Sequence, residues 1–312
     1  MNKEDKIYVA GHSGMVGAAV VRCLKAHGFN NLVLRKSTEL DLARQADVER
    51  FFLDEKPDHV FLAAARVGGI LANKTYRAEF IYINIQIQSN VIHAAWKVGV
   101  KKLLFFSSSC VYPRLCPQPM MEEYLWTGPL EPTNEPYAVA KLAGMSMCKA
   151  YNEQYGTKFI SLIPTNLYGP NDNYDPQQSH IMAALIHKFH TAKTLESPQV
   201  VLWGTGTPRR ELMYVDDAAH AAVFLMEIGT DVGPINVGLG EDKTVRELAE
   251  LVRHIVGYQG RVEFDRDKPD GTPQKLLDSD VIHALGWRAR VCLTEGIAKA
   301  YEWYLQSSSS KR

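Results

Sequence analysis

The sequence predicts an α/β protein in which helices cover both faces of a parallel sheet. Short apolar runs alternate with segments of helical period over the first 170 residues. Strands that are buried on both faces of a parallel sheet have this continuous apolar character, and helices are the usual connections between them. A glycine-rich turn directly after the first apolar run supports the same prediction, because such turns join a buried strand to a helix.

Five apolar runs in this part of the chain are the expected strands, and the segments between them hold the expected helices. The strands are predicted at 6–10, 32–34, 59–65, 103–106 and 159–163. Gly28 ends the helix after the first strand, and Pro57 follows the helix expected at 42–55. Amphipathic spacing predicts a further helix at 87–98, and another is expected at 137–155.

The chain changes character after residue 170, which predicts a second and smaller α/β unit. Thr244 and Glu247 form a capping box that opens a helix reaching residue 254. We expect a first domain at 1–170 and a substrate domain at 171–312, with some later elements returning to the first. The other expected elements are a polar loop at 171–179, helices at 181–192 and 218–227, a turn-rich segment at 203–212, a strand at 235–238, a loop at 268–273 and two short final helices.

Composition and charge exclude several classes of protein. The chain has 312 residues, with 35 basic and 35 acidic side chains. A net charge of zero argues against binding to nucleic acid or to an anionic membrane surface. The five cysteines are scattered without a Cys-x-x-Cys pair, so neither a metal site nor a disulfide framework is expected. The charged amino-terminal segment and the lack of a run of about 18 apolar residues predict a cytoplasmic protein.

Three glycines lie between the first strand and the first helix, with the spacing Gly11-x-x-Gly14-x-x-Gly17. The first glycine permits a tight turn, the second lets the backbone approach a pyrophosphate, and the third lets the helix pack on the strand. The amino end of the helix then stabilises phosphate charge. This arrangement predicts a Rossmann-type dinucleotide site, although a turn that simply prefers glycine has the same pattern.

The residues after the second strand indicate which dinucleotide is bound. NAD sites usually carry an acidic residue here for the ribose 2′-hydroxyl. This chain has Arg35, Lys36 and Ser37 instead, and the two cations favour the 2′-phosphate of NADP. Asp41 is expected on the adenine side, and the small residues at 63–65 would let a dinucleotide lie close to the backbone. The alternative is that Arg35 and Lys36 are solvated surface charges.

The stretch from residue 107 to 141 contains the candidate reacting groups. An apolar strand stops just before Ser108, and Tyr137 and Lys141 sit at positions i and i+4 of a helix, where side chains share a face. A phenol has a pKa near ~10, and a neighbouring ammonium is expected to lower it. The serine hydroxyl would hold a substrate oxygen against the same phenol. Tyr-x-x-x-Lys alone is weak, because a surface helix pair has the same spacing.

The glycine triplet, the strand ending at Ser108 and Tyr137-x-x-x-Lys141 together resemble the extended short-chain dehydrogenase/reductases. Five further segments extend the likeness over nearly the whole chain to the nucleotide-sugar epimerase–reductases of that family. The resemblance implies NADPH-dependent conversion of GDP-4-keto-6-deoxy-D-mannose to GDP-L-fucose, by epimerisation at C3 and C5 and then hydride reduction of the C4 ketone. The segments are AAARVGGI at 63–70, SSCVYP at 108–113, EPTNEPYA at 131–138, PTNLYGP at 164–170 and KPDGTP at 268–273.

The resemblance also implies roles for individual residues. Ser108, Tyr137 and Lys141 match the reductase triad, and Cys110 and His180 match the pair that exchanges protons during epimerisation. A thiol and an imidazole titrate close enough to neutral pH for this, and an oxygen stabiliser can serve both stages. From the residues alone, a buried core cysteine is the commoner explanation of Cys110, and His180 has the alternative of a helix-start residue without a role.

The implied binding residues form two sets. The cofactor set comprises Gly11, His12, Ser13, Gly14, Met15, Val16, Gly17, Arg35, Lys36, Ser37, Asp41, Leu42, Ala63, Ala65, Lys141, Pro164, Asn166, Leu167 and His180. The substrate set comprises Ser108, Asn166, Lys188, Trp203, Arg210 and Asp270. The planar guanidinium of Arg210 suits a diphosphate. Ser13 and Ser37 stand where some relatives carry basic residues, and Lys188 stands where we expect arginine, which weakens those expected contacts.

Two other functions fit parts of the sequence. A sugar-nucleotide 4-epimerase or dehydratase would recycle tightly bound NAD, but a dehydratase usually has an Asp-Glu pair after the serine, where this chain has Ser109 and Cys110. A non-catalytic dinucleotide-binding regulator typically loses the tyrosine or the lysine, and both are present. The family fold also implies a homodimer in which helices 87–98 and 137–155 of each subunit form a four-helix bundle.

Overall fold

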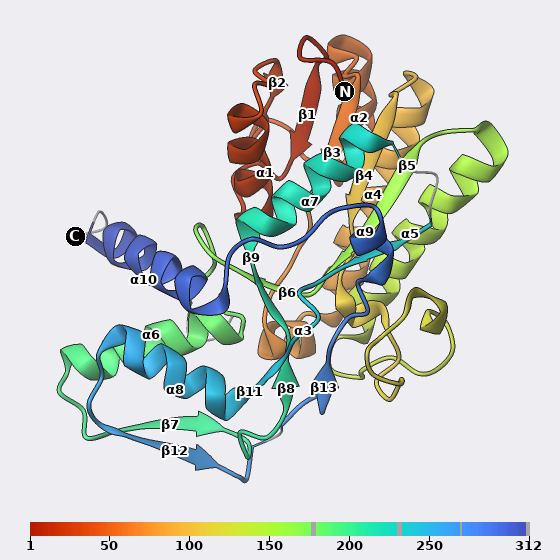
Figure 1. Ribbon diagram of the computed structural model, residues 1–312. Coiled ribbons are helices and arrows are strands. Elements are labelled where there is room, and N and C mark those ends of the chain that lie inside the picture. The colour runs from red at the N-terminus through yellow and green to blue at the C-terminus, as the bar shows by residue number, and fades with distance from the viewer. Residues whose placement is uncertain (176–178, 230–232, 269, 310–312) are drawn as a thin grey trace.

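The computed structural model describes residues 1–175, 179–229, 233–268 and 270–309 (Figure 1). Its centre is a six-stranded sheet with the order β10-β5-β4-β3-β1-β2, in which every neighbouring pair is parallel. The predicted parallel sheet is confirmed, and the third strand ends at Leu62 rather than at residue 65. The strands are β1 Ile7–Ala10, β2 Leu32–Val33, β3 His59–Leu62, β4 Lys102–Phe106, β5 Phe159–Pro164 and β10 Ile235–Val237.

Helices cover both faces of this sheet, because successive strand residues point to opposite sides. In β3, Val60 and Leu62 pack into one apolar core and Phe61 packs into the other. The doubly wound arrangement is therefore confirmed. The helices on the first face are α2 Gln45–Glu55, α4 Arg77–Lys97 and α5 Glu135–Tyr155, and those on the second are α1 Met15–Ala26 and α7 Val215–Ile228.

Helix α4 begins at Arg77, ten residues before the predicted start, and the short helix α3 Ile70–Thr75 precedes it. The prediction stopped short because Asn84 interrupts the apolar pattern, although both Asn84 and Gln88 are buried. Their amide groups are satisfied by main chain. The Asn84 side chain donates to the carbonyl of Arg66 at 3.0 Å, and the Gln88 side chain donates to that of Ala140 at 2.6 Å.

Residues beyond 170 build a second group of helices and short strands, below the six-stranded sheet in the view of Figure 1. Three helices share one apolar core: α6 Ile181–Thr194, α8 Val245–Val256 and α10 Leu293–Ser309. The strands pair as β7 Gln199–Trp203 with β12 Arg261–Asp265, β6 Asn166–Tyr168 with β9 Leu212–Tyr214, and β8 Arg209–Arg210 with both β11 Lys243–Thr244 and β13 Gln274–Lys275.

Several predictions for this second group can be compared with the structure. The capping box of Thr244 and Glu247 is confirmed at the start of α8. The turn-rich prediction for 203–212 is wrong in part, because the segment contains β8, which is too short to show a period. The prediction of two short final helices holds for α9 Asp280–Ala284 but is wrong for α10, which has 17 residues.

Elements from beyond residue 170 lie on the six-stranded sheet, among them α9, whose Ile282 packs into the same core as α1. Strand β10 pairs with β5, with Ile235 opposite Leu162, and α7 packs its alanine-rich face against the same core as α1. These are the later elements that return to the first part of the chain. The division into domains at residue 170 stays a prediction.

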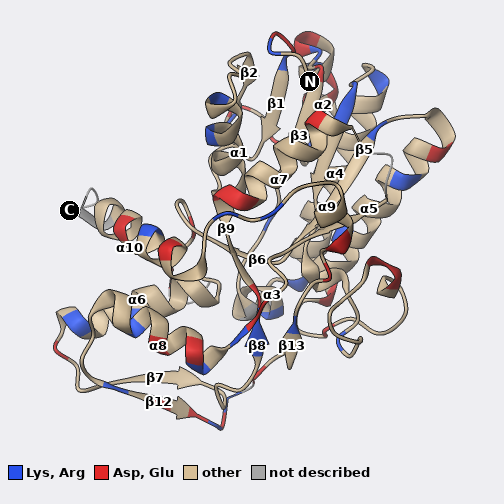
Figure 2. Ribbon diagram, in the orientation of Figure 1, with Lys and Arg blue, Asp and Glu red and all other residues tan. Residues whose placement is uncertain are grey.

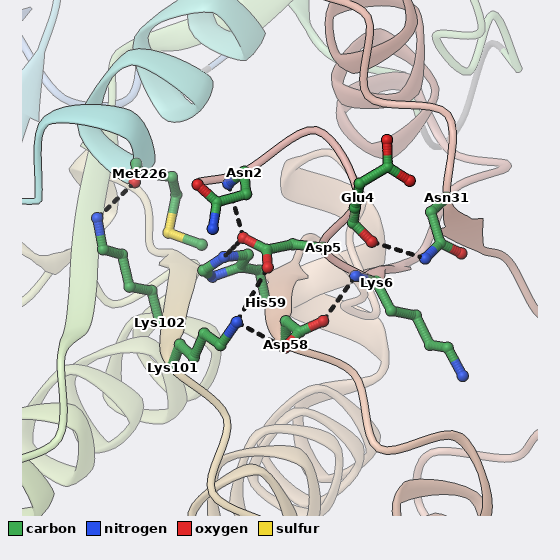
Figure 3. A network of polar contacts seen from close by, with 10 residues as sticks. All are labelled: Asn2, Glu4, Asp5, Lys6, Asn31, Asp58, His59, Lys101, Lys102 and Met226. Carbon is green, nitrogen blue, oxygen red and sulfur yellow. Dashed lines mark hydrogen bonds and ion pairs between the residues drawn. The ribbon is translucent and has the colours of Figure 1, made fainter.

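A polar network closes the sheet at the amino ends of its strands (Figure 3). His59 Nε2 lies 3.0 Å from a carboxylate oxygen of Asp5, and Lys101 Nζ lies 2.9 Å from the other. Lys101 also pairs with Asp58 at 2.9 Å. Burial opposes ionisation of Asp5, but hydrogen bonds from the Asn2 amide, Lys101 and His59 outweigh it and hold the pKa of that carboxyl far below its usual range. The network therefore stabilises the sheet through a charged carboxylate.

Candidate active site

The glycine loop leaves the carboxyl end of β1 and forms a backbone cradle. Gly11 has a φ of +84°, and a Cβ there would stand 2.7 Å from the Ala64 nitrogen. A Cβ on Gly17 would stand 2.1 Å from the Gly11 carbonyl oxygen, so the helix packs directly on the turn. Helix α1 has no side-chain cap at Gly14 and no acidic residue in its first turn. Its amino end is therefore open to an anion, and the cradle fits a pyrophosphate.

The remaining residues of this turn are polar and close to the same edge. His12 has a buried Nδ1 without a hydrogen-bond partner in the described part of the chain, and Ser13 is exposed. Ala63 and residue 65 follow β3, where the backbone runs against Gly11. An unsatisfied ring nitrogen beside an anion cradle is a further group that a cofactor could satisfy.

The two predicted cations after β2 differ in their surroundings. The Arg35 guanidinium pairs with Glu55 at 2.5 Å and lies 5.8 Å above the ring centroid of Phe51. Lys36 is exposed, and its side chain has no ion-pair partner among the described residues. Its backbone amide donates to Glu39 at 2.7 Å, which fixes the turn. Lys36 is thus the cation that is free to meet a phosphate.

The other expected adenosine-side residues are on the surface of the same turn. Ser37 is exposed, and Asp41 accepts the amide N–H of Ala43 at 3.0 Å and pairs with Arg44 at 3.4 Å. Leu42 is half-buried against the core under α2 and α4. Asp41 therefore holds the turn together in the structure, and its predicted contact with adenine stays a prediction.

The chain turns sharply after β4, and this turn places two candidate groups. Ser107 is buried and its hydroxyl donates to the sulfur of Met145 at 2.9 Å. Ser108 is half-buried and caps the 3-10 turn η1 Ser109–Val111, with its hydroxyl oxygen 3.4 Å from the amide nitrogen of Cys110. The Cys110 side chain is buried next to it. The prediction that Ser108 ends the strand region is confirmed.

Tyr137 and Lys141 lie on one face of α5, as the i, i+4 spacing predicted. Lys141 Nζ is 5.8 Å from the ring centroid of Tyr137 and 4.7 Å from that of Phe105, and it donates to the carbonyl of Phe106 at 2.7 Å. Lys141 is 3% exposed, and burial lowers its pKa to about 8. The side chain therefore joins the helix to the end of β4, two residues before Ser108.

The expected lowering of the Tyr137 pKa by Lys141 is wrong for this structure. Burial raises the pKa of Tyr137, the nearby Cys110 thiolate would raise it further, and a hydrogen bond with Ser108 acts in the opposite direction. The ammonium is directed at a backbone carbonyl rather than at the phenol oxygen, and the ring packs edge-on against Phe80. Tyr137 is consequently a protonated phenol at neutral pH.

Cys110 and His180 are both influenced by the charge of one half-buried cation, Lys275. Burial raises the pKa of the Cys110 thiol, while the charge of Lys275, the Ser108 hydrogen bond and the charge of Lys141 act to lower it. His180 directly precedes α6 and is reached by solvent, yet the protein around its ring and the charge of Lys275 lower its pKa. Lys275 was missed by the sequence analysis, since a lysine in a two-residue strand carries no motif.

Strands β8 and β13 both carry basic residues, drawn in blue in Figure 2. Lys275 in β13 is the register partner of Arg210 in β8. Burial lowers the pKa of both, and the carboxylate of Glu131 opposes this in each case. Glu131 is itself buried and pairs with Arg114 at 3.3 Å. Two cations that are only partly neutralised form a site for an anionic group.

The other predicted substrate residues lie on the second group of elements. Lys188 is exposed on α6 and donates to the carbonyl of Val201 at 3.2 Å. Trp203 ends β7 and is 58% exposed, which leaves an aromatic face open. Asp270 accepts the amide and the hydroxyl of Thr205 at 2.7 and 2.9 Å, so it holds the turn that follows Trp203.

Pro164, Asn166 and Leu167 lie where β5 passes into β6, and Asn166 is half-buried there. They therefore follow the carboxyl end of the strand next to β4, the edge at which ligands bind in doubly wound sheets. The described residues hold no cluster of three metal-ligating side chains. Among them there is also no helix with the length and apolar character that crossing a membrane requires.

Sequence comparison defines the class of protein to which this fold and site belong. A profile of the NAD dependent epimerase/dehydratase family matches residues 7–238, and the chain belongs to this family. Within it, the chain is similar to the GDP-L-fucose synthases. It is 55% identical to GDP-L-fucose synthase 1 of Arabidopsis thaliana over 98% of this chain and 95% of the relative. It is 50% identical to the GDP-L-fucose synthase of Escherichia coli (strain K12) over 99% of both chains.

Solved structures agree with this assignment. MlghC, a GDP-mannoheptose C4 reductase from Campylobacter jejuni with NADP bound, has a TM-score of 0.91 and 41% identity, over 98% of this chain and 99% of that one. A GDP-L-fucose synthetase from Naegleria fowleri bound to NADP has a TM-score of 0.91 and 27% identity, over 99% of this chain and 97% of that one.

Proposed function

We propose that this protein converts GDP-4-keto-6-deoxy-D-mannose to GDP-L-fucose with NADPH, by epimerisation at C3 and C5 followed by reduction of the C4 ketone. One observation carries the proposal. The Ser108 hydroxyl oxygen is 3.4 Å from the Cys110 amide nitrogen, and Ser108 influences the pKa of both the Tyr137 phenol and the Cys110 thiol, so the group proposed for the ketone oxygen and the group proposed for the neighbouring carbons both lie beside Ser108. The full-length similarity to GDP-L-fucose synthases supports the same substrate.

The backbone cradle from Gly11 to Gly17 would hold the pyrophosphate of the cofactor, and Lys36 would meet the 2′-phosphate of NADP. The nicotinamide cofactor supplies the hydride for the reduction when it is bound. Lys141 would keep the end of β4 and the Tyr137 ring in fixed positions next to the cofactor, through its hydrogen bond to the Phe106 carbonyl. The remaining residues of the predicted cofactor set are proposed to complete this site.

Epimerisation uses the acidity of the protons next to a ketone. Tyr137 and Ser108 would donate hydrogen bonds to the C4 oxygen and stabilise the negative charge that forms there. One of Cys110 and His180 would remove the proton from a carbon, and the other would return one to the opposite face. The shared charge of Lys275 supports a coupled role for this pair, because it disfavours protons on both groups.

Reduction reuses the same oxygen contacts. As hydride reaches C4, the oxygen becomes an alkoxide and takes a proton from the Tyr137 phenol. The raised pKa of Tyr137 keeps this proton in place until the alkoxide forms. Lys141, 5.8 Å from the ring, would keep the phenol in place through its bond to the Phe106 carbonyl.

Arg210 would bind the diphosphate of the GDP-sugar, and the open face of Trp203 suits the guanine base. Lys188, Asp270 and Asn166 are proposed as further contacts.

Two subunits are proposed to pair through α4 and α5. The large side chains Tyr82 and Tyr155 on these helices are 64% and 45% exposed, which fits a surface that a second copy covers. A reduced Cys110 thiol suits the cytoplasm.

A spectrophotometric assay tests the proposal. The purified chain is mixed with GDP-4-keto-6-deoxy-D-mannose and NADPH, and we expect loss of absorbance at the nicotinamide band with formation of GDP-L-fucose. An epimerase or dehydratase that recycles NAD would be purified with its cofactor and would show no net change at that band. Binding of NADPH without turnover of any sugar nucleotide would instead point to a regulator.

A further inference from the structure

Glu211 is a fully buried carboxylate that the proposed chemistry does not use. It lies between β8 and β9 and is 0% exposed. One carboxylate oxygen accepts the amide N–H of Leu239 at 2.6 Å and that of Gly240 at 2.9 Å, and the other oxygen accepts the amide N–H of Leu277 at 2.9 Å. Burying a carboxylate is unfavourable unless hydrogen bonds compensate it, and here three backbone amides from remote segments donate to it.

These bonds tie together the strands that carry the cations of the site. Glu211 directly follows Arg210, and Leu277 is two residues beyond Lys275, the register partner of Arg210. The backbone amide of Glu211 also donates to the carbonyl of Lys275 at 3.1 Å. The main chain of Glu211 thus holds β13 at Lys275 itself, and its side chain holds the chain two residues further on, at Leu277.

The position of Lys275 matters because it is the cation that acts on both proton-exchanging groups. It is the largest favourable influence on ionisation of the Cys110 thiol, and it is the charge that disfavours the imidazolium of His180. Electrostatic interactions of this kind depend steeply on distance in a poorly solvated site. A movement of β13 would therefore change the proton balance of the Cys110–His180 pair.

We propose that Glu211 is a positioning residue, which fixes Lys275, the register partner of Arg210, beside the Cys110–His180 pair. Its effect on turnover rests on the proposed function, but the placement of the charge can be tested without substrate. Glu211→Gln keeps the volume and one acceptor oxygen. Its NH2 group would face a backbone donor where the second oxygen was, so one of the two segments loses its partner.

The test is the rate at which iodoacetamide alkylates Cys110, followed by mass spectrometry of the Cys110 peptide over a range of pH. Loss or displacement of a nearby cation raises the thiol pKa and leaves less thiolate. We expect Lys275→Met and Glu211→Gln each to slow alkylation near neutral pH by about fivefold, for a pKa change of about 0.7. In the Lys275→Met background, Glu211→Gln is expected to add less than about twofold, because the group that it positions is gone.

Asp217→Asn is the matched control. Asp217 is also a buried carboxylate that accepts two backbone amides, those of Arg290 at 3.1 Å and Val291 at 2.9 Å, but it ties down a segment that holds none of the cations discussed here. It is expected to leave Cys110 alkylation within about twofold of the wild-type rate. Glu211→Asp, which keeps the charge and shortens the reach, is the second variant and should slow alkylation as Glu211→Gln does.

Three results would overturn the positioning role: unchanged alkylation in both Glu211 variants, fully additive effects of Glu211→Gln and Lys275→Met, or an equal effect of Asp217→Asn. A rise in melting temperature on addition of NADP, equal to that of the wild-type chain, confirms that each variant is folded. Turnover of GDP-4-keto-6-deoxy-D-mannose by the wild-type chain is measured separately. Failure of the proposed function would appear there, while the alkylation rates would still decide the role of Glu211.

Discussion

Lys141 is buried together with its charge, and the free energy of that burial can be measured by unfolding. Its pKa is about 8 in the folded protein against an ordinary value of 10.5, because burial disfavours the ammonium form. Between these two values the unfolded chain binds more protons than the folded chain, so stability rises with pH in this window. The difference in pKa corresponds to roughly 3 kcal/mol, of which roughly 2.5 kcal/mol is recovered between about pH 7 and about pH 10.

The assay is urea unfolding of the wild-type chain and of Lys141→Met at these two pH values. Other titrating groups are present in both proteins and cancel in the difference. The hydrogen bond from Lys141 to the Phe106 carbonyl, at 2.7 Å, contributes to both pH values and cancels as well. We expect the free energy of unfolding of the wild type, relative to the variant, to rise by roughly 2.5 kcal/mol from about pH 7 to about pH 10. A difference that stays constant or falls with pH refutes the buried charge.

Three further predictions concern the epimerisation, the cofactor and the sheet. Cys110→Ser should lower turnover of GDP-4-keto-6-deoxy-D-mannose by about a hundredfold or more, measured as NADPH oxidation, because the proton-transfer group is lost. Lys36→Ala should weaken NADPH binding by about fivefold in a fluorescence titration while leaving NADH binding unchanged, since an exposed ion pair contributes about 1 kcal/mol. Arg35→Ala should change this preference less, because Arg35 is paired with Glu55. Asp5→Asn should lower the urea midpoint at neutral pH, and the loss should shrink as pH falls below the ordinary Asp value of 3.8.

Each of these has a contrary outcome. Undiminished NADPH oxidation by Cys110→Ser would remove Cys110 from the proton exchange. A larger effect of Arg35→Ala than of Lys36→Ala on the preference for NADPH would show that Arg35, rather than Lys36, binds the 2′-phosphate. The sign for Asp5 follows from its lowered pKa: the charged carboxylate stabilises the fold fully above the unfolded pKa, and this contribution is lost as pH falls from the unfolded pKa towards the lower folded pKa. A destabilisation by Asp5→Asn that is the same at neutral and acid pH would contradict the network of Figure 3.

Local patterns were enough to predict the sheet and the cofactor loop. The motif from Gly11 to Gly17 consists of residues that are close together in the sequence. The structure shows the close backbone approach that their spacing predicts. The apolar strands are equally local, because burial on both faces leaves a continuous run. Tyr137 and Lys141 are also a local pattern, because residues at positions i and i+4 of a helix share a face.

The site could be predicted only in part, because several of its groups meet through the fold. Lys275 reaches Cys110 by strand pairing with Arg210, a contact between residues that are far apart in the chain. Arg35 looked like a cofactor cation, but helix α2 brings Glu55 to its side chain. The Tyr137 pKa was expected to fall, yet burial outweighs a lysine that is directed at a carbonyl. Each of these outcomes depends on tertiary distances that no local pattern contains.

The most direct test of the central claim is the position of deuterium in the product. The reaction is run in deuterated water with GDP-4-keto-6-deoxy-D-mannose and NADPH, and the product is examined by NMR. If Cys110 and His180 exchange protons at the carbons beside a ketone held by Ser108 and Tyr137, GDP-L-fucose carries deuterium at both C3 and C5. Reduction at C4 with hydrogen retained at C3 and C5 would show a plain reductase and contradict the account.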